Sequence, residues 1–158
     1  MAAVPAALDT DRGPPLTIPL RHFLVGLGFL LAGVALGLAE SLRMAPPGAR
    51  LAHVHLLLVG WICCTILGAM TQFVPVWSGV ELHSRRLANV QLLLVSSGLT
   101  GLASALLLGE TTLLAVAGTL LALGFWTFVY TLGRTLLRAR PWDVTERHFA
   151  FALACFAL

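Results

Sequence analysis

Residues 51–77 read LAHVHLLLVGWICCTILGAMTQFVPVW, a stretch that contains no Asp, Glu, Lys or Arg. A helix needs about 20 predominantly apolar residues to cross the hydrocarbon core of a bilayer, and this stretch is longer. It lacks the strict alternation of apolar and polar residues that marks a membrane barrel strand. Because only helices and closed barrels satisfy every backbone polar group in lipid, the stretch predicts a transmembrane helix.

Three further apolar runs of spanning length occur, at about residues 19–39, 87–109 and 112–137. A Pro-Pro-Gly turn at residues 46–48 separates the first run from the second. The connection between the last two runs is very short, which predicts that they form a helical hairpin. We therefore expect an all-α fold, a polytopic transmembrane helix bundle with four complete spans and a partial fifth.

The two ends of the chain carry weaker signals. Residues 1–17 are rich in proline and hold early charges, so they predict a flexible N-terminal tail ahead of a transmembrane helical domain at residues 18–158. The partial fifth span, residues 149–158, covers about 15 Å as a helix, half of a bilayer core. We expect it to belong to a longer protein or, as the less favoured alternative, to pack loosely as a half-helix.

The composition excludes several classes of protein. Hydrophobic residues make up 58% of the 158 residues and charged residues 11%, whereas soluble domains carry about 25% charged residues. The net charge of +3 comes with ten arginines and no lysine. These arginines form no basic patch interleaved with aromatic residues, which excludes nucleic acid as a partner. Three cysteines are too few for a disulfide framework, so the lipid bilayer is the main expected partner.

The arginines also indicate the orientation of the chain. One side collects the N-terminal tail and the connections after the second and fourth runs, with Arg12, Arg21, Arg85, Arg86, Arg134, Arg138, Arg140 and Arg147. The opposite side holds only Arg43 and Arg50. Because basic residues favour the cytoplasmic side, we expect a multi-pass protein of the cytoplasmic (inner) membrane of a prokaryote, with its N-terminus inside.

Two histidines near the start of the second run are the candidate metal ligands. Ionisable side chains within a span are costly and are functional candidates by default. On an α-helix His53 shares a face with Gly60 and Gly68, whereas His55 points about 200° away. A histidine beside a strip of small residues suits haem, because the macrocycle can lie against the backbone while the imidazole reaches the iron. Alternatively, both histidines lie among the headgroups near Arg50.

The remaining polar side chains predict structural roles. His22 suits an interfacial anchor, and His83 and His148 lie beside arginines in polar connections, where we expect them to be solvated. Thr71, Gln72 and Gln91 are expected to hydrogen-bond between helices near the inner side. The three cysteines are expected to pack as small apolar residues.

Small residues predict where the helices approach closely. Gly33 and Gly37 form a GxxxG pair in the first run, and Ser97, Gly101 and Ala105 form a small-residue face in the third. Both patterns fit a dimer seam, but packing within one chain is favoured, because four short-looped helices must pack in any case.

The second run also carries a motif. His53-x-His55 is followed by Gly60, by Gly68 and by the sequence Pro-Val-Trp-Ser-Gly at residues 75–79. This pattern resembles that of the NnrS family, membrane proteins that contain haem and copper and are linked to nitric oxide stress. It is similar, more loosely, to subunit I of the haem-copper oxidase superfamily, in particular the cbb3-type oxidases and nitric oxide reductases.

The resemblance implies that His53 or His55 holds haem b, with Gly60 and Gly68 beside the macrocycle, for electron transfer or nitric oxide handling. The face analysis favours His53 as the axial ligand. Copper is not expected on this chain alone, because the later histidine-bearing helices of the oxidases have no counterpart here. A second axial histidine would come from another copy of the chain in a homo-oligomer or from other respiratory membrane subunits.

Two other interpretations remain. The chain fits a non-catalytic membrane subunit or assembly factor that has kept the helix pattern without a cofactor. A transporter or channel is disfavoured, because the spans show no mid-membrane charge, broken-helix pair or inverted repeat. Whether the protein is an enzyme stays open on the sequence.

Overall fold

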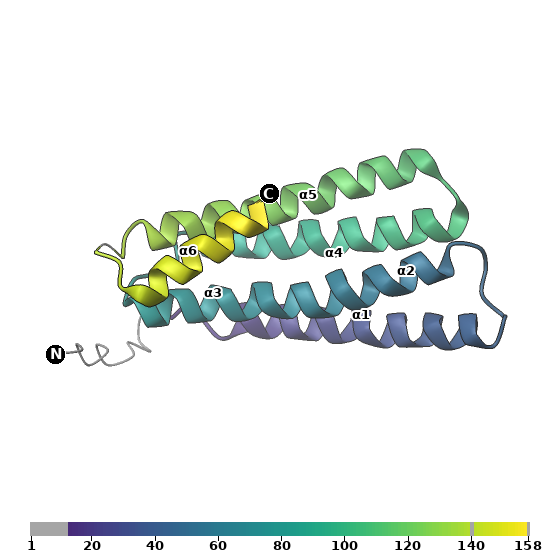
Figure 1. Ribbon diagram of the computed structural model, residues 1–158, viewed down its shortest axis with the longest axis horizontal. Helices are drawn as coiled ribbons and strands as arrows, with labels where there is room; N and C mark the ends of the chain where they lie inside the picture. The colour runs from purple at the N-terminus through teal and green to yellow at the C-terminus, as the bar shows by residue number, and fades with distance from the viewer. Residues whose placement is uncertain (1–12, 140, 158) are drawn as a thin grey trace.

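The computed structural model describes residues 13–139 and 141–157 (Figure 1). Within these residues every regular element is a helix, which confirms the expected all-α class. Residues 1–12, most of the predicted tail, lie outside the described part of the chain.

Among the described residues, four helices are long and apolar enough to cross a membrane, which confirms the predicted number of spans. They are α1 (Thr17–Ser41), the second span (Ala49–Ser78), α4 (Arg85–Leu108) and α5 (Thr111–Leu136). The second span consists of α2 (Ala49–His55), the π-helix η2 (Leu56–Cys63) and α3 (Cys64–Ser78). A shorter helix, α6 (Val144–Ala157), follows α5.

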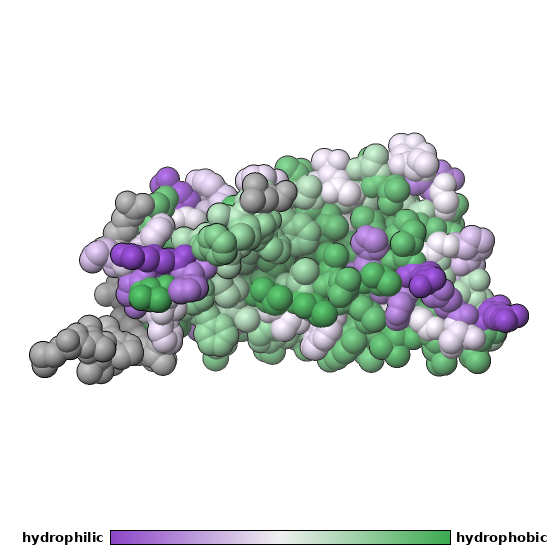
Figure 2. All heavy atoms as spheres, in the orientation of Figure 1, coloured by the Kyte–Doolittle hydropathy of each residue, from purple (hydrophilic) through white to green (hydrophobic). Residues whose placement is uncertain are grey.

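The helices pack as two antiparallel pairs that lie side by side (Figure 1). The first pair is α1 with the second span, and the second is the predicted α4–α5 hairpin. α6 folds back along α5 on the side of α3 and ends about midway along α5 (Figure 1). On the visible face, apolar side chains cover the middle and hydrophilic ones gather toward the two ends (Figure 2). A bilayer requires this distribution of its spanning proteins.

Glycines on α4 and α5 let the hairpin close. A Cβ atom on Gly98 would lie 2.7 Å from the backbone nitrogen of Leu121, and one on Gly124 would lie 2.7 Å from Val95 Cγ2. A Cβ on Gly101 would lie 3.0 Å from that of Ala117. The predicted small-residue face therefore packs within the chain, with Gly98 in the place expected for Ser97, which is exposed.

α6 is an ordered helix that begins at Val144, five residues before the predicted partial span. Asp143 Oδ1 accepts hydrogen bonds from the backbone nitrogens of Thr145 (2.7 Å) and Glu146 (3.1 Å), and Glu146 Oε2 accepts one from the Asp143 nitrogen (3.1 Å). This reciprocal arrangement is a capping box, which fixes the start of a helix. The Phe156 ring meets the Phe125 ring edge to face at 5.2 Å. Residues 149–157 are therefore ordered, but none of them is buried, which agrees with the expected loose packing of this segment.

The connection between α3 and α4 is tied to the end of α5 through His83. Its backbone nitrogen donates to Thr135 Oγ1 at 3.0 Å, Arg138 Nη2 donates to its Nδ1 at 3.0 Å, and its ring meets Tyr130 edge-on at 5.6 Å. His83 is partly exposed, in keeping with the expected solvation, and it also contacts the end of α5, which the short hairpin brings back to this connection. His148, by contrast, is exposed as expected.

The His83 contact is expected to depend on pH. Desolvation, followed by the positive charges of Arg138 and Arg134, lowers the pKa of His83 below its ordinary value of about 6.5. A lowered pKa means that the contact stabilises the fold above pH 6.5 and is lost as the pH falls through the lower folded value. Histidine NMR titration in detergent should give a midpoint below 6.5, and Arg138→Gln should raise it. A midpoint at 6.5 that Arg138→Gln leaves unchanged contradicts this account.

Candidate functional site

The HxH pair lies in α2, where both imidazoles are held by backbone carbonyl groups. His53 Nδ1 lies 2.7 Å from the carbonyl oxygen of Gly33 in α1, and His55 Nδ1 lies 2.8 Å from that of Leu51 in its own helix. A carbonyl only accepts, so each Nδ1 carries the proton. Within the described residues no hydrogen bond reaches the Nε2 atom of His53 or His55, so in the neutral form each Nε2 lone pair has no protein partner.

The His53 ring is part of the seam between α1 and α2. A Cβ atom on Gly37 would lie 2.5 Å from His53 Cε1 and 2.7 Å from its Nδ1, so the ring fills the notch that this glycine leaves. Gly33 and Gly37, the predicted GxxxG pair, therefore pack against the second span of the same chain. His53 and His55 are both half-buried, and they leave the helix about 200° apart.

The π-helix η2 follows the pair directly and changes the register of the second span. Its hydrogen bonds join residues five apart, so each turn holds more residues than in an α-helix. Residues at four-residue steps, Leu56, Gly60, Cys64 and Gly68, are all buried as a result. This keeps one face of the span in contact with α1 along its length. The sequence predicts a regular α-helix over this span, and η2 differs from that prediction.

The glycine strip beside His53 is filled by neighbouring side chains. A Cβ atom on Gly60 would lie 2.5 Å from Phe29 Cβ and 2.9 Å from Leu99 Cδ2, and one on Gly68 would lie 2.5 Å from His22 Cβ. These glycines admit α1 and α4 closely, which is the common role of small residues in membrane helix packing. The strip therefore has no room for a macrocycle within one chain.

His22 is a buried polar residue, which differs from its predicted place as an anchor at the membrane interface. Its side chain is 0% exposed, with Nδ1 2.9 Å from the Ile18 carbonyl oxygen and Nε2 3.2 Å from Gln91 Oε1. Cys64 Sγ donates to its carbonyl oxygen at 3.4 Å. The expected bond between helices is thus confirmed for Gln91, whose partner is His22. It is wrong for Thr71, whose Oγ1 donates to the Gly68 carbonyl oxygen of the same helix at 2.7 Å. His22 and Gln91 pack together because Gly68 leaves room for the His22 side chain.

Four buried side-chain atoms in the described part of the chain have no hydrogen-bond partner: Thr65 Oγ1, Gln72 Oε1, Ser78 Oγ and Gln91 Nε2.

The hydrogen bond between His22 and Gln91 fixes the orientation of the Gln91 amide. A neutral imidazole has one N–H group, and in His22 this group is Nδ1–H, which donates to the Ile18 carbonyl oxygen. His22 Nε2 can therefore only accept, which requires the Gln91 amide to present its nitrogen. The His22–Gln91 hydrogen bond then links α1 to α4.

No group of three or more His, Cys, Asp or Glu side chains in the described residues could hold a metal ion together. The three cysteines are free: Cys64 is buried, Cys63 half-buried and Cys155 exposed. Any metal held by the HxH pair would thus depend on one imidazole, with a cofactor or a second protein supplying the remaining ligands.

Comparisons of the chain with family models, with characterised proteins and with solved structures find no match.

Proposed function

We propose that this multi-pass membrane protein binds haem b through its HxH pair and serves electron transfer or nitric oxide handling. The observation that carries the proposal is the placement of two imidazoles within one turn of a membrane span, each with its Nδ1 bonded to a backbone carbonyl and no partner at Nε2. His148 has the same Nδ1 bond but lies exposed on α6, outside the four spans. Metal-ligating histidines commonly show this arrangement, because the second-shell bond fixes the tautomer and the ring orientation. The HxH…G…PxWSG motif adds the resemblance to haem proteins.

The donor atoms fit a haem iron, but the expected cradle does not. Since Phe29, Leu99 and His22 fill the strip at Gly60 and Gly68, these glycines support the site by packing rather than by touching the macrocycle. The His53 side chain is hydrogen-bonded to the Gly33 carbonyl group of α1, whereas the His55 side chain is hydrogen-bonded only within its own helix. We therefore infer that His55 is the axial ligand and that His53 is a positioning residue, the reverse of the sequence expectation.

When bound, haem b supplies one-electron redox chemistry at its iron. The chain supplies the rest: His55 offers its neutral Nε2, and α1 fixes the start of α2 through the Gly33–His53 hydrogen bond. The two imidazoles diverge around the helix, so one iron does not take both. A second ligand to the iron would come from another copy of the chain or from a respiratory membrane subunit.

The ligand assignment is tested by substitution of each histidine. His55→Ala is expected to remove the Soret absorbance of the detergent-purified protein, while the circular dichroism stays helical. His53→Ala is expected to keep part of the absorbance with a shifted band, because the ring position is loosened. His148→Ala, at an exposed position on α6, is the control and should change nothing. Retention of full absorbance in His55→Ala with its loss in His53→Ala would reverse the assignment.

The proposed location is the cytoplasmic membrane of a prokaryote, with the N-terminus inside. In the described residues Arg21, Arg85, Arg86, Arg134, Arg138 and Arg147 lie toward the proposed inner end and Arg43 and Arg50 toward the other. In a background without native cysteines, Met44→Cys should react with a membrane-impermeant maleimide in intact cells, and Glu81→Cys should react only after lysis. Both positions are exposed, so accessibility within the protein is matched. The opposite pattern would invert the topology.

A second candidate function is a non-catalytic membrane subunit or assembly factor. The filled glycine strip favours it, because close helix packing alone explains Gly60 and Gly68. A folded, colourless protein that stays colourless when haem is supplied would select this candidate.

A further inference from the structure

His83, in the connection between α3 and α4, lies against a row of side chains at the end of α5. Its ring contacts the Tyr130 ring edge-on at 5.6 Å, and its Nδ1 accepts a hydrogen bond from Arg138 Nη2 at 3.0 Å. Arg134, in the last turn of α5, lies between Tyr130 and Arg138 at four-residue steps, which places it on the same side of the helix. Two guanidinium groups from successive turns therefore lie beside one imidazole.

The Arg138 hydrogen bond determines which groups this row offers to a ligand. A guanidinium only donates, so His83 Nδ1 is the acceptor and the proton of the neutral ring is on Nε2. His83 is partly exposed, and Arg134 and Arg138 are both exposed. Their remaining polar groups are thus N–H donors, and none of these donors has an acceptor among the described residues.

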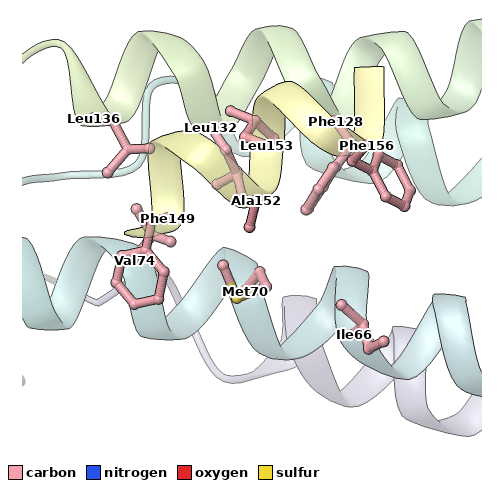
Figure 3. A pocket seen from close by; sticks show the side chains of 10 residues that line it. All are labelled: Ile66, Met70, Val74, Phe128, Leu132, Leu136, Phe149, Ala152, Leu153 and Phe156. Atoms are coloured by element: carbon pink, nitrogen blue, oxygen red, sulfur yellow. The ribbon is translucent and has the colours of Figure 1, made fainter. Parts of the chain in front are cut away.

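The carboxylates of α6 lie on the other side of α5. Toward α3 and α6, α5 presents apolar side chains that line a shared cavity: Phe128, Leu132 and Leu136 (Figure 3). Residues 130, 134 and 138 each follow one of these by two positions, which places them about 200° away around the helix. Asp143 and Glu146, in the capping box at the start of α6, are therefore separated from the arginine row by the body of α5.

The positive charge of the row is not neutralised by the part of the chain that the structure describes. No carboxylate there forms an ion pair with Arg134 or Arg138, and Glu81, the acid closest to His83 in sequence, is exposed. Desolvation and then the charges of Arg138 and Arg134 lower the pKa of His83, so the field of both arginines reaches its ring. An anion at this place would meet two guanidinium groups and no competing carboxylate.

We propose that His83, Arg134 and Arg138 bind a phosphate group. A phosphate has more acceptor oxygens than a carboxylate, so it can accept from two turns of a helix and from the facing connection at once. Arginine is also the preferred residue for bidentate phosphate binding. The site lies at the opposite end of the spans from the HxH pair and is independent of the haem proposal. Two sources share this chemistry, an anionic phospholipid headgroup and a soluble phosphate.

The first arm of the test adds inorganic phosphate to the full chain in detergent, at constant pH and ionic strength with chloride as the replaced anion. Histidine NMR should show a saturable change at His83 toward the protonated form, because a nearby anion stabilises the imidazolium. His148, exposed on α6, should not change. Arg134→Gln should weaken the apparent phosphate affinity by about fivefold, which corresponds to about 1 kcal/mol for one arginine. Arg147→Gln, at an exposed position of α6, is the matched control and should leave it unchanged.

The second arm identifies the source with nanodiscs of phosphatidylcholine, with or without phosphatidic acid, in phosphate-free buffer. A negative surface alone attracts protons and moves both histidines, whereas a bound headgroup moves His83 more than His148. A larger change at His83 in either arm supports the site, and the arm that gives it identifies the source. Equal changes at the two histidines, no change in either arm, or a response that Arg134→Gln leaves unaltered overturns the proposal.

Discussion

Gly98→Ala is expected to push α4 and α5 apart and to lower the stability of the bundle by about 1–3 kcal/mol. The new methyl group would lie 2.7 Å from the Leu121 nitrogen and 3.0 Å from the Ala117 oxygen. Both are backbone atoms of α5, so no side-chain rotation relieves the clash. Alanine also has a higher helix propensity than glycine, which stabilises a helix interior by about 1 kcal/mol. This gain offsets part of the cost of the clash.

Gly118→Ala is the matched control for this experiment. It is also a glycine-to-alanine change inside a membrane helix, but nothing lies within 4 Å of the added Cβ atom. Thermal unfolding in detergent, followed by circular dichroism, should therefore show a lower midpoint for Gly98→Ala and an unchanged or higher one for Gly118→Ala. Equal midpoints for the two variants would mean that α4 and α5 are not packed as described.

Gly60→Leu is expected to have a still larger effect, because it introduces four carbon atoms where one does not fit. The first of them would lie 2.5 Å from Phe29 Cβ, an atom fixed to the backbone of α1. The cost should reach or exceed the upper end of the range of about 1–3 kcal/mol for overpacking. The folded yield in detergent, read by size-exclusion chromatography, should fall even in protein prepared without haem.

This variant also separates two views of the glycine strip. If Gly60 faced an open haem cradle, Gly60→Leu would fold normally and lose only haem. Gly118→Leu, at a position with open space, is the control for the added bulk. A well-folded Gly60→Leu apoprotein that binds no haem would contradict the packing of Gly60 against Phe29 and Leu99. It would indicate instead that the macrocycle lies against Gly60.

The membrane fold could be predicted because hydropathy over about 20 residues reports spans directly. Leu51 to Trp77 and the other three runs became helices of spanning length. The start of α6 was also present in the sequence, as Asp143 followed three residues later by Glu146, which is a capping-box signature. Hydropathy alone placed that helix too late, because its first turn is polar.

The arrangement within the site could not be predicted in the same way. Whether His22 lies at an interface or in the core depends on which helix covers it, and this is decided by Gly68 on α3 and Gln91 on α4. Helix periodicity predicts that His53 and Gly60 share one side of the span, and both contact α1 in the structure. Periodicity shows which face carries small residues but not which helix packs on it. The π-helix likewise has no clear composition signal.

Haem b binding by the HxH pair is tested most directly by the absorption spectrum and pyridine haemochrome of the full chain, expressed with haem supplied and purified in detergent. We expect a Soret band, a haem b α-band in the haemochrome, and iron that co-elutes with the folded protein. A helical, monodisperse protein without iron and without a Soret band would contradict it.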